Sequence, residues 1–171
     1  MTFEITREIG IDMGHRVSNH GSKCANLHGH RYTIQATCRS VELQSEGAQQ
    51  GMTLDFGFLK AEMMIVVDNN HDHGTTLWIE DPIVAQLVTA DNLVQARELV
   101  VQQGAAVANI TGWGVFTLVP FTPTAEELAR FWFTRLAPRV AERSGGHAQL
   151  IKLRVWETPN CFADYRLPTE P

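Results

Sequence analysis

The stretch Cys24-Ala25-Asn26-Leu27-His28-Gly29-His30 brings one thiol and two imidazoles close together, and His15 precedes it. His28 and His30 are two residues apart, so on an extended strand their side chains point to the same face. With His15 as a third ligand they would surround one metal ion and leave one position open, as catalytic zinc sites do. We therefore predict a metal site at His15, His28 and His30, with zinc as the first candidate, although imidazole ligands also suit other divalent ions.

Plainer explanations of these residues stay open at this point. The chain contains 7 histidines, so one His-x-His pair also arises by chance. A single cysteine such as Cys24 is more often a small buried hydrophobic residue than a nucleophile. Cys38 alternates with apolar positions and Cys161 begins a predicted strand, so both are interpreted as structural thiols. The sequence has no Cys-x-x-Cys pair, which excludes a structural zinc finger of that type.

Strands are expected on both sides of this stretch. Residues 2–13 alternate loosely between apolar and polar types and run up to His15, and residues 30–41 alternate again. This pattern predicts an antiparallel pair of strands. Residues 150–156 and 161–165 have the same pattern around a Pro-Asn turn and predict a second hairpin.

Two helices are expected between the hairpins. Residues 58–67 contain strong helix formers, with Asp55 as a predicted N-cap and Asn69-Asn70 as the predicted end. Thr124, followed three residues later by Glu127, is a capping box that begins a second amphipathic helix. Residues 79–115 separate these helices; they predict a helical segment broken near residues 89–92, a stop at Gly104 and a short strand at 115–119.

The order of elements predicts an α+β fold in which helices pack on one face of a four-stranded antiparallel sheet. We expect one domain over residues 1–171, with an insertion at about 79–115. Open sheet edges are usually paired or covered, so a homo-oligomer is expected.

The net charge of −5 and the lack of a basic run argue against a nucleic-acid partner. No membrane span and no signal peptide are recognisable, so a cytoplasmic protein is expected.

Six short motifs follow one another in an informative order: His15-Arg16, Cys24-x-x-x-His28-Gly29-His30, Leu54-Asp55-Phe56, Asp72-His73, Pro123-Thr124-Ala125-Glu126 and Trp156-Glu157-Thr158. Together they resemble the 6-pyruvoyltetrahydropterin and 6-carboxytetrahydropterin synthase family, over about residues 3–78 and 116–166. The resemblance implies the tunnelling fold (T-fold). It also implies that sheets join into a β-barrel in a trimer or dimer of trimers, with active sites between subunits.

The spacing of three residues between Cys24 and His28 resembles the 6-carboxytetrahydropterin synthase branch, because the pyruvoyl-forming branch has five. The resemblance implies a zinc-dependent lyase that converts 7,8-dihydroneopterin triphosphate to 6-carboxytetrahydropterin, acetaldehyde and triphosphate, in queuosine or deazapurine biosynthesis. Two alternatives stay open. One is a pyruvoyl-forming or aldolase-like enzyme of the same fold, and the other is a non-catalytic member that binds zinc and a pterin.

The resemblance also implies roles for residues outside the histidine cluster. Cys24, Asp72 and His73 would transfer protons, and Glu157, with help from Thr124, would bind the pterin. General chemistry is consistent with this: a thiol near a cation has a lowered pKa, and a carboxylate pairs well with adjacent N–H donors. Thr124 is equally explained as a helix cap. We favour His73 over its neighbour His71 because the family motif has the order Asp-His.

Overall fold

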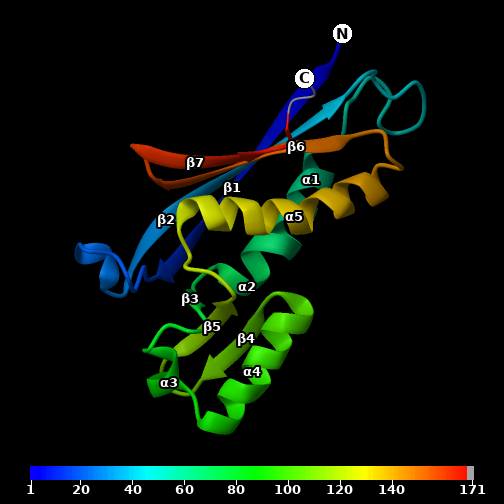
Figure 1. Cartoon of the computed structure of the whole chain (residues 1–171). Helices are drawn as coiled ribbons and strands as arrows, with labels where there is room; N and C mark the ends of the chain where they lie inside the picture. Colours follow the sequence, from blue (N-terminus) through cyan, green and yellow to red (C-terminus); the bar gives the residue numbers. More distant parts are fainter. Residues whose placement is uncertain (169–171) are drawn as a thin grey trace.

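The two predicted hairpins form the larger part of one sheet in the computed structural model, which describes residues 1–168 (Figure 1). β1 (Phe3–His15) pairs along its whole length with β2 (His28–Ser40), and His15 lies opposite His28. β2 also pairs with β6 (Gln149–Thr158), which forms the second hairpin with β7 (Cys161–Arg166). Both hairpins are therefore confirmed. The last three residues of the predicted 1–171 domain lie outside the described range.

The sheet has seven strands, so the prediction of four was wrong. Three short strands extend it: β3 (Thr75–Trp78), β4 (Ala106–Ile110) and β5 (Gly114–Val119), in the order β4-β5-β3-β1-β2-β6-β7. β3 joins β1 in parallel through only two residue pairs, Gly14 with Thr75 and His15 with Thr76. Strands this short do not show a clear alternation of apolar and polar residues in the sequence. β3 and β4 are strands because they pair with neighbouring strands of the sheet.

The first helix is longer than expected. α1 (Phe56–Met63) begins at Asp55, whose carboxylate accepts a hydrogen bond from the backbone N–H of Phe58 at 2.8 Å, as predicted. It continues through the π-helical segment η2 (Met64–Asp68) into the short α2 (Asn69–His71). Asn69 and Asn70 therefore continue the helix, and the predicted stop there was wrong. The chain leaves the helix at Asp72, where the backbone becomes extended.

The second helix begins where its capping residues predict. α5 (Ala125–Arg143) has Thr124 as its N-cap, and the Thr124 hydroxyl accepts a hydrogen bond from the backbone N–H of Glu127 at 3.4 Å. The helix ends at Ser144, before two glycines. α1 and α5 bury their apolar sides against one face of the sheet, where Ile11 of β1 and Ile34 of β2 are fully buried. The predicted α+β class, with these helices on one face of the sheet, is confirmed.

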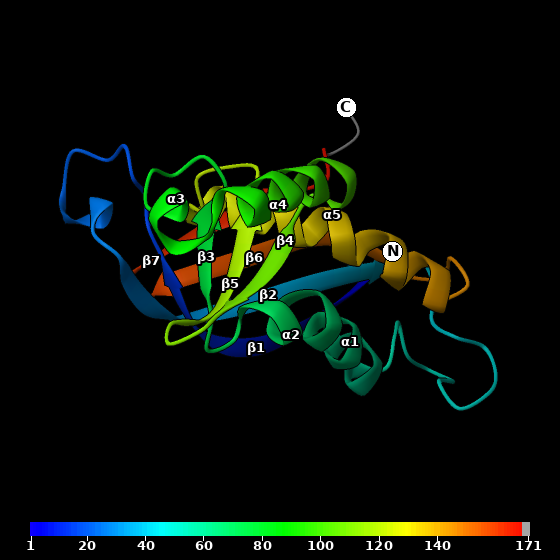
Figure 2. The same ribbon diagram turned by 90° about the horizontal axis from the view of Figure 1, so that it is seen from below.

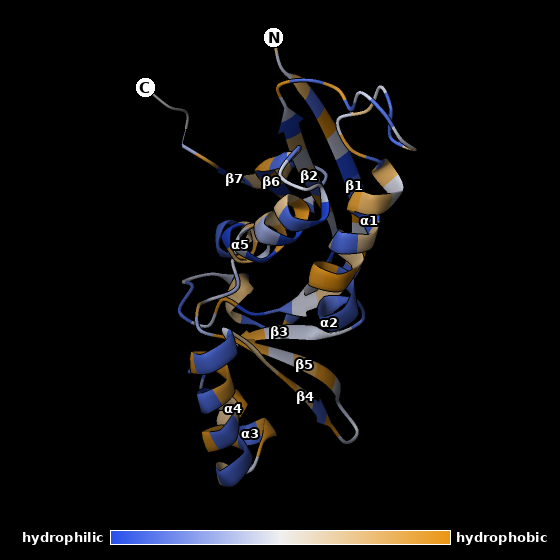
Figure 3. Cartoon of the chain, turned by 90° about the vertical axis from the view of Figure 1, so that its right-hand side faces the viewer, coloured by the Kyte–Doolittle hydropathy of each residue, from blue (hydrophilic) through white to orange (hydrophobic). Residues whose placement is uncertain are grey.

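The long segment between the helices builds a small unit at one end of the sheet. It contains α3 (Val84–Leu87), α4 (Ala90–Gln103), β4 and the start of β5. Thr89 caps α4, and Gly104 ends it with a φ of 74°, as the sequence predicts. A second apolar cluster, separate from the main core, holds the unit together. Figure 3 shows this unit extending away from β1, β2, α1 and α5.

The loop between β1 and β2 carries Cys24 and includes η1 (Lys23–Ala25). Figure 2 shows this loop projecting at the end of β1 opposite to the N-terminus. Among residues 1–168, no helix has both the length and the apolar character needed to cross a membrane.

Candidate metal centre and active site

Three histidines meet where β1 ends and β2 begins. The register places His15 opposite His28, and His28 and His30 lie on the same face of β2, as the spacing predicts. The centroid of the His15 ring lies 4.5 Å from that of His28 and 5.2 Å from that of His30. One ring nitrogen from each residue lies within 4.8 Å of the other two. The sheet thus builds the cluster from two adjacent strands.

The cluster fits a divalent cation. The Nδ1 atoms of His15 and His28 each lie 2.8 Å from a backbone carbonyl oxygen, that of Pro123 and that of Asn26. A carbonyl oxygen can only accept a hydrogen bond, so both Nδ1 atoms carry the proton and donate it. Both Nε2 atoms therefore keep a free lone pair. These Nε2 atoms are 3.1 Å apart, close to the separation of about 3.3 Å expected for two ligands of tetrahedral zinc.

Electrostatics also favour the neutral, metal-binding form of His15 and His30. Burial lowers the pKa of both His15 and His30, and the neighbouring His28 lowers both further, while Glu157 opposes the shift. Neutral imidazole is the ligand form, because a protonated ring has no free lone pair. The cluster is thus prepared for a cation near neutral pH.

Tyr32 packs against two rings of the histidine cluster and contacts Glu157. It is the next residue after His30 on the same face of β2, and it is fully buried. Its ring meets those of His15 and His30 edge-on, with centroids 5.7 and 5.6 Å away. The Tyr32 hydroxyl donates to a carboxylate oxygen of Glu157 at 3.4 Å. Burial and the Glu157 charge raise the pKa of Tyr32, so the phenol stays a donor.

A cavity of about 320 Å³ opens beside the histidines. Its lining includes five of the residues that the sequence singles out: His15, Cys24, His28, Thr124 and Glu157. The Glu157 carboxylate lies 3.6 Å from Nε2 of His15. A thiol, a carboxylate and two of the three clustered imidazoles therefore face one space large enough for part of a small heterocyclic ligand.

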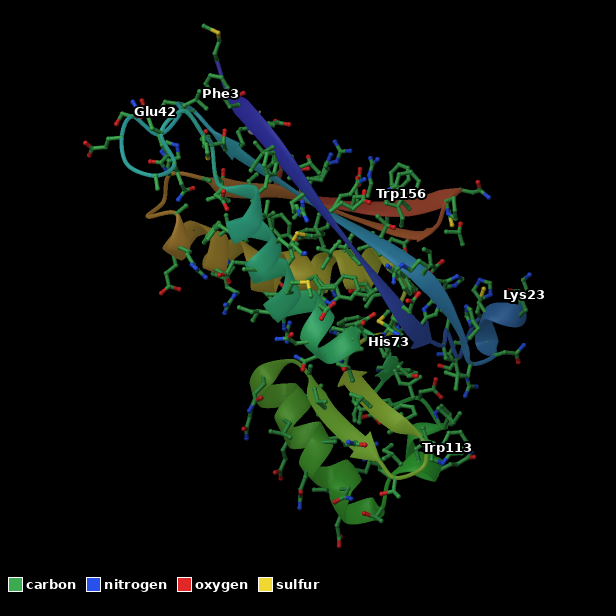
Figure 4. The ribbon with its side chains drawn as sticks, turned by 180° about the vertical axis from the view of Figure 1, so that it is seen from behind. Phe3, Lys23, Glu42, His73, Trp113 and Trp156 are labelled. Atoms are coloured by element: carbon green, nitrogen blue, oxygen red, sulfur yellow. The ribbon has the colours of Figure 1, made fainter. Side chains whose placement is uncertain are left out.

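Cys24 reaches this cavity from η1. The Ser22 side chain caps the turn at the backbone N–H of Cys24, and the Cys24 carbonyl accepts a hydrogen bond from the backbone N–H of Val17 at 3.0 Å. Figure 4 shows the neighbouring Lys23 at the tip of the β1–β2 loop. Cys24 is partly exposed, whereas Cys38 is fully buried and burial raises the pKa of its thiol to about 12. The structural interpretation of Cys38 is consistent with this burial.

Asp72 and His73 lie at a different place, on the edge of β1, and neither lines the cavity. The backbone of Asp12 donates to the Asp72 carboxylate at 2.9 Å and accepts from the backbone N–H of His73 at 2.7 Å. Nδ1 of His73 donates to the other Asp72 oxygen at 2.7 Å. Among residues 1–168, His73 is the one non-glycine residue with positive φ (54°), so this edge holds a strained backbone in place.

The hydrogen bond to Asp72, reinforced by the Asp72 charge, raises the pKa of the exposed His73. Its neighbour His71 has the opposite environment: it is buried beneath α5, and its Nδ1 donates to the Thr76 hydroxyl at 2.8 Å. Burial, and then the charge of Arg135, lower the pKa of His71 to about 3. His71 is therefore a core residue, whereas His73 is exposed and paired with the partly buried Asp72.

The structure also adds residues that the sequence did not single out. Cys161, interpreted from the sequence as a structural thiol, is exposed and lines the cavity. His20 and Glu126 line the same cavity. The place of Tyr32 follows from the two-residue alternation that already relates His28 to His30. No comparable signal marks Cys161, because β7 reaches the cavity through its pairing with β6.

Comparisons with known proteins agree with this geometry. The profile of the 6-pyruvoyl tetrahydropterin synthase family matches residues 4–168. This chain belongs to that family. A 6-carboxy-5,6,7,8-tetrahydropterin synthase of Haemophilus influenzae is 33% identical over 164 residues, which cover 96% of this chain and 99% of the relative. The protein of the same name from Aquifex aeolicus is 28% identical and covers 97% and 99%.

Solved structures show the same fold. An uncharacterized protein from Wolinella succinogenes superposes with a TM-score of 0.73 at 22% identity, covering 97% of this chain and 98% of that one. The 6-pyruvoyl tetrahydropterin synthase of Plasmodium vivax gives 0.62 at 14% identity, with 99% of each chain covered. At these identities the likeness establishes the fold alone. The T-fold expected from the family motifs is therefore confirmed.

Proposed function

We propose that this protein is a 6-carboxy-5,6,7,8-tetrahydropterin synthase, which converts 7,8-dihydroneopterin triphosphate to 6-carboxytetrahydropterin, acetaldehyde and triphosphate. The observation that carries the proposal is the cavity in which Cys24, Glu157, Thr124 and two of the clustered histidines meet. The names of the curated relatives, which match nearly the whole chain, favour the carboxy-forming reaction. The spacing of three residues between Cys24 and His28 favours it as well.

The proposal gives the histidine cluster the role of metal ligand. His15, His28 and His30 would hold zinc, with the Nδ1 hydrogen bonds of His15 and His28 fixing their orientation. When bound, the ion would polarise the oxygen atoms of the substrate side chain as a Lewis acid. His28 and His30 need no rearrangement for this, because the strand already presents both to one point.

The remaining groups would bind the pterin and move protons. The Glu157 carboxylate suits the paired N–H donors of a pterin ring, and Tyr32 orients it. Thr124 already caps α5, and its place on the cavity wall supports an added contact with the ligand. Cys24 would take or return a proton at the substrate side chain, which requires only that the thiol face the bound substrate.

Asp72 and His73 would act in the cavity of a neighbouring subunit. The pair is exposed and lies apart from the lining of its own cavity, which supports this arrangement. A trimer or dimer of trimers with joined sheets would also pair the free edge of β1. We further propose a cytoplasmic enzyme of queuosine biosynthesis, and we interpret residues 79–115 as an insertion within a single domain.

Product analysis tests the proposal. The zinc-loaded protein is incubated with 7,8-dihydroneopterin triphosphate, and the pterins are identified by mass spectrometry beside a Cys24→Ala variant. We expect 6-carboxytetrahydropterin from the wild type and at least about a hundredfold less from the variant, since one positioned proton-transfer group contributes this much. A pyruvoyl product would contradict the branch. Unchanged substrate with zinc still bound would favour a non-catalytic pterin-binding protein.

A further inference from the structure

Asp81 is a buried carboxylate at the start of the long segment between the helices, and the proposed chemistry gives it no role. Its side chain is fully buried. The backbone on either side fixes it: its N–H donates to the carbonyl of Trp78 and its carbonyl accepts from Val84, each at 2.9 Å. One carboxylate oxygen accepts from the backbone N–H of Ile83 at 3.0 Å. Asp81 is thus anchored to both β3 and α3.

Arg16 connects this carboxylate to the loop that carries Cys24. Its Nη1 lies 3.2 Å from the same oxygen of Asp81, and its Nε donates to the carbonyl of Ala25 at 2.8 Å. A guanidinium is planar and rigid, so its two contacts move together. Arg16 also follows His15 directly, so one side chain joins the metal-site strand, the Cys24 loop and the 79–115 segment. Figures 1 and 2 both show this loop and α3 on the same side of the molecule.

Capping of the following turn does not explain the charge of Asp81. An uncharged Asn or Ser would accept the same hydrogen bond from Ile83. A buried carboxylate is unfavourable unless a cation compensates it, and the second oxygen of Asp81 has no hydrogen-bond partner in residues 1–168. Arg16 is the cation that contacts the first oxygen, Oδ1 of Asp81. The ion pair with Arg16 therefore accounts for a charge at this position.

We propose that Asp81 is a positioning residue that acts through Arg16 to hold the Cys24 loop against the cavity. The inference rests on the proposed function of Cys24. It also gives the long segment a structural role, because the turn before α3 is the fixed point from which the loop is held. Ala25 is bonded directly to Cys24, so movement of Arg16 is transmitted to the thiol. The other hydrogen bonds that hold η1 come from Ser22 and Val17, which are residues of the same loop. They do not connect η1 to another part of the fold.

The test measures the loop itself in the purified full-length protein. Iodoacetamide labels Cys24 and Cys161, and peptide mass spectrometry gives the two rates separately. Cys161 lines the same cavity from β7 and serves as the internal reference. In Asp81→Asn we expect Cys24 to be alkylated about fivefold faster relative to Cys161, as loss of the ion pair with Arg16 would allow. Amide hydrogen exchange over residues 23–26 should accelerate in parallel.

Glu80→Gln is the matched control, because Glu80 precedes Asp81 and forms an exposed ion pair with Arg97. It should leave the Cys24 to Cys161 ratio at the wild-type value. Arg16→Lys covers the case in which Asp81→Asn does not fold: lysine keeps the charge but cannot bridge Asp81 and Ala25 together. It too should raise the ratio. An unchanged ratio and unchanged exchange in the folded variants would overturn the proposal.

Kinetics give a second readout. If the protein has the proposed activity, Asp81→Asn should lower kcat while KM stays within about twofold, because Glu157 and the histidines are untouched. A raised KM with unchanged kcat would contradict a positioning role for the Cys24 loop. Alkylation and hydrogen exchange need no pterin, so failure of the proposed reaction would be recognised separately.

Discussion

The Nε2 atoms of His15 and His28 face each other at 3.1 Å because β1 and β2 place the two residues in register. Each ring is turned by a backbone carbonyl, that of Pro123 for His15 and that of Asn26 for His28. The hydrogen bond to Pro123 also links the cluster to the start of α5. The geometry of the histidine cluster is therefore set by the hairpin and the helix together.

Metal binding should depend on the cluster and not on histidine in general. We expect His30→Ala to lower zinc affinity by at least about a hundredfold, because one of three protein ligands is lost. Competition with a chromophoric chelator measures this. His20→Ala is the control, since His20 lines the same cavity but lies outside the cluster. Equal losses in both variants would contradict the assignment.

The Asp72–His73 pair should be visible by titration. The pKa of His73 is raised above its usual value by the Asp72 carboxylate, so protonation should persist to higher pH than for a free histidine. NMR titration of Asp72→Asn should show the His73 pKa falling back toward about 6.5. The stabilising pair is present below the ordinary histidine pKa and is lost as pH rises through the raised value. Identical titrations of His73 in both proteins would rule out this interaction.

A site shared between subunits predicts complementation. Cys24→Ala and His73→Ala should each be nearly inactive alone. When they are unfolded, mixed in equal amounts and reassembled, about a quarter of the sites should contain both intact residues, because subunits combine at random. The mixture should therefore recover about a quarter of the wild-type activity per site. No recovery, with oligomers of normal size, would place both residues in one subunit's site.

His71 should make the fold sensitive to acid. Its pKa is lowered to about 3 by burial and then by Arg135, whereas the unfolded chain has an ordinary histidine there. The neutral form is favoured in the folded state, so its contribution is complete above about pH 6.5 and declines as pH falls toward 3. Denaturant unfolding at pH 7 and pH 4 should show roughly 3 kcal/mol of this loss in the wild type and not in His71→Gln. The exposed His20→Gln should retain the wild-type loss.

Glu62 should contribute to stability more than surface acids do. It is buried in α1, and its two oxygens each accept from an arginine of α5, Arg139 and Arg143, at 2.6 Å. Glu62→Gln should reduce the free energy of unfolding by about 2 kcal/mol, because two charge-assisted hydrogen bonds are weakened. Glu80→Gln, which removes an exposed pair with Arg97, should change it by less than about 0.5 kcal/mol. Equal effects would show that α1 and α5 are not joined by this contact.

The parts of the fold that sequence predicted are those with local signals. Alternation identified β1, β2 and the β6–β7 hairpin, and the side chains of Asp55 and Thr124 marked the starts of α1 and α5. β3 and β4 were missed because each is a short strand whose pairing partner, β5, lies far along the chain or follows a turn. Such strands form because they pair with neighbouring strands, and their own residues carry little strand signal.

The histidine cluster was likewise predictable, because the two-residue spacing of His28 and His30 has a direct geometric meaning on a strand. The family resemblance implied active sites between subunits, but no local signal in the sequence places Asp72 and His73 apart from the cavity. The Arg16–Asp81 ion pair could not be predicted, because nothing in the sequence places the start of the long segment against the Cys24 loop. Contacts between loops depend on the assembled fold.

Acetaldehyde release distinguishes the proposed carboxy-forming reaction from pyruvoyl formation. The carboxy-forming reaction removes two carbons of the substrate side chain, whereas pyruvoyl formation retains all of them. The zinc-loaded wild-type protein is given 7,8-dihydroneopterin triphosphate, and acetaldehyde is trapped and quantified beside the pterin product. We predict equal amounts of acetaldehyde and 6-carboxytetrahydropterin. A pterin product that forms without acetaldehyde would show that the protein does not catalyse the carboxy-forming reaction.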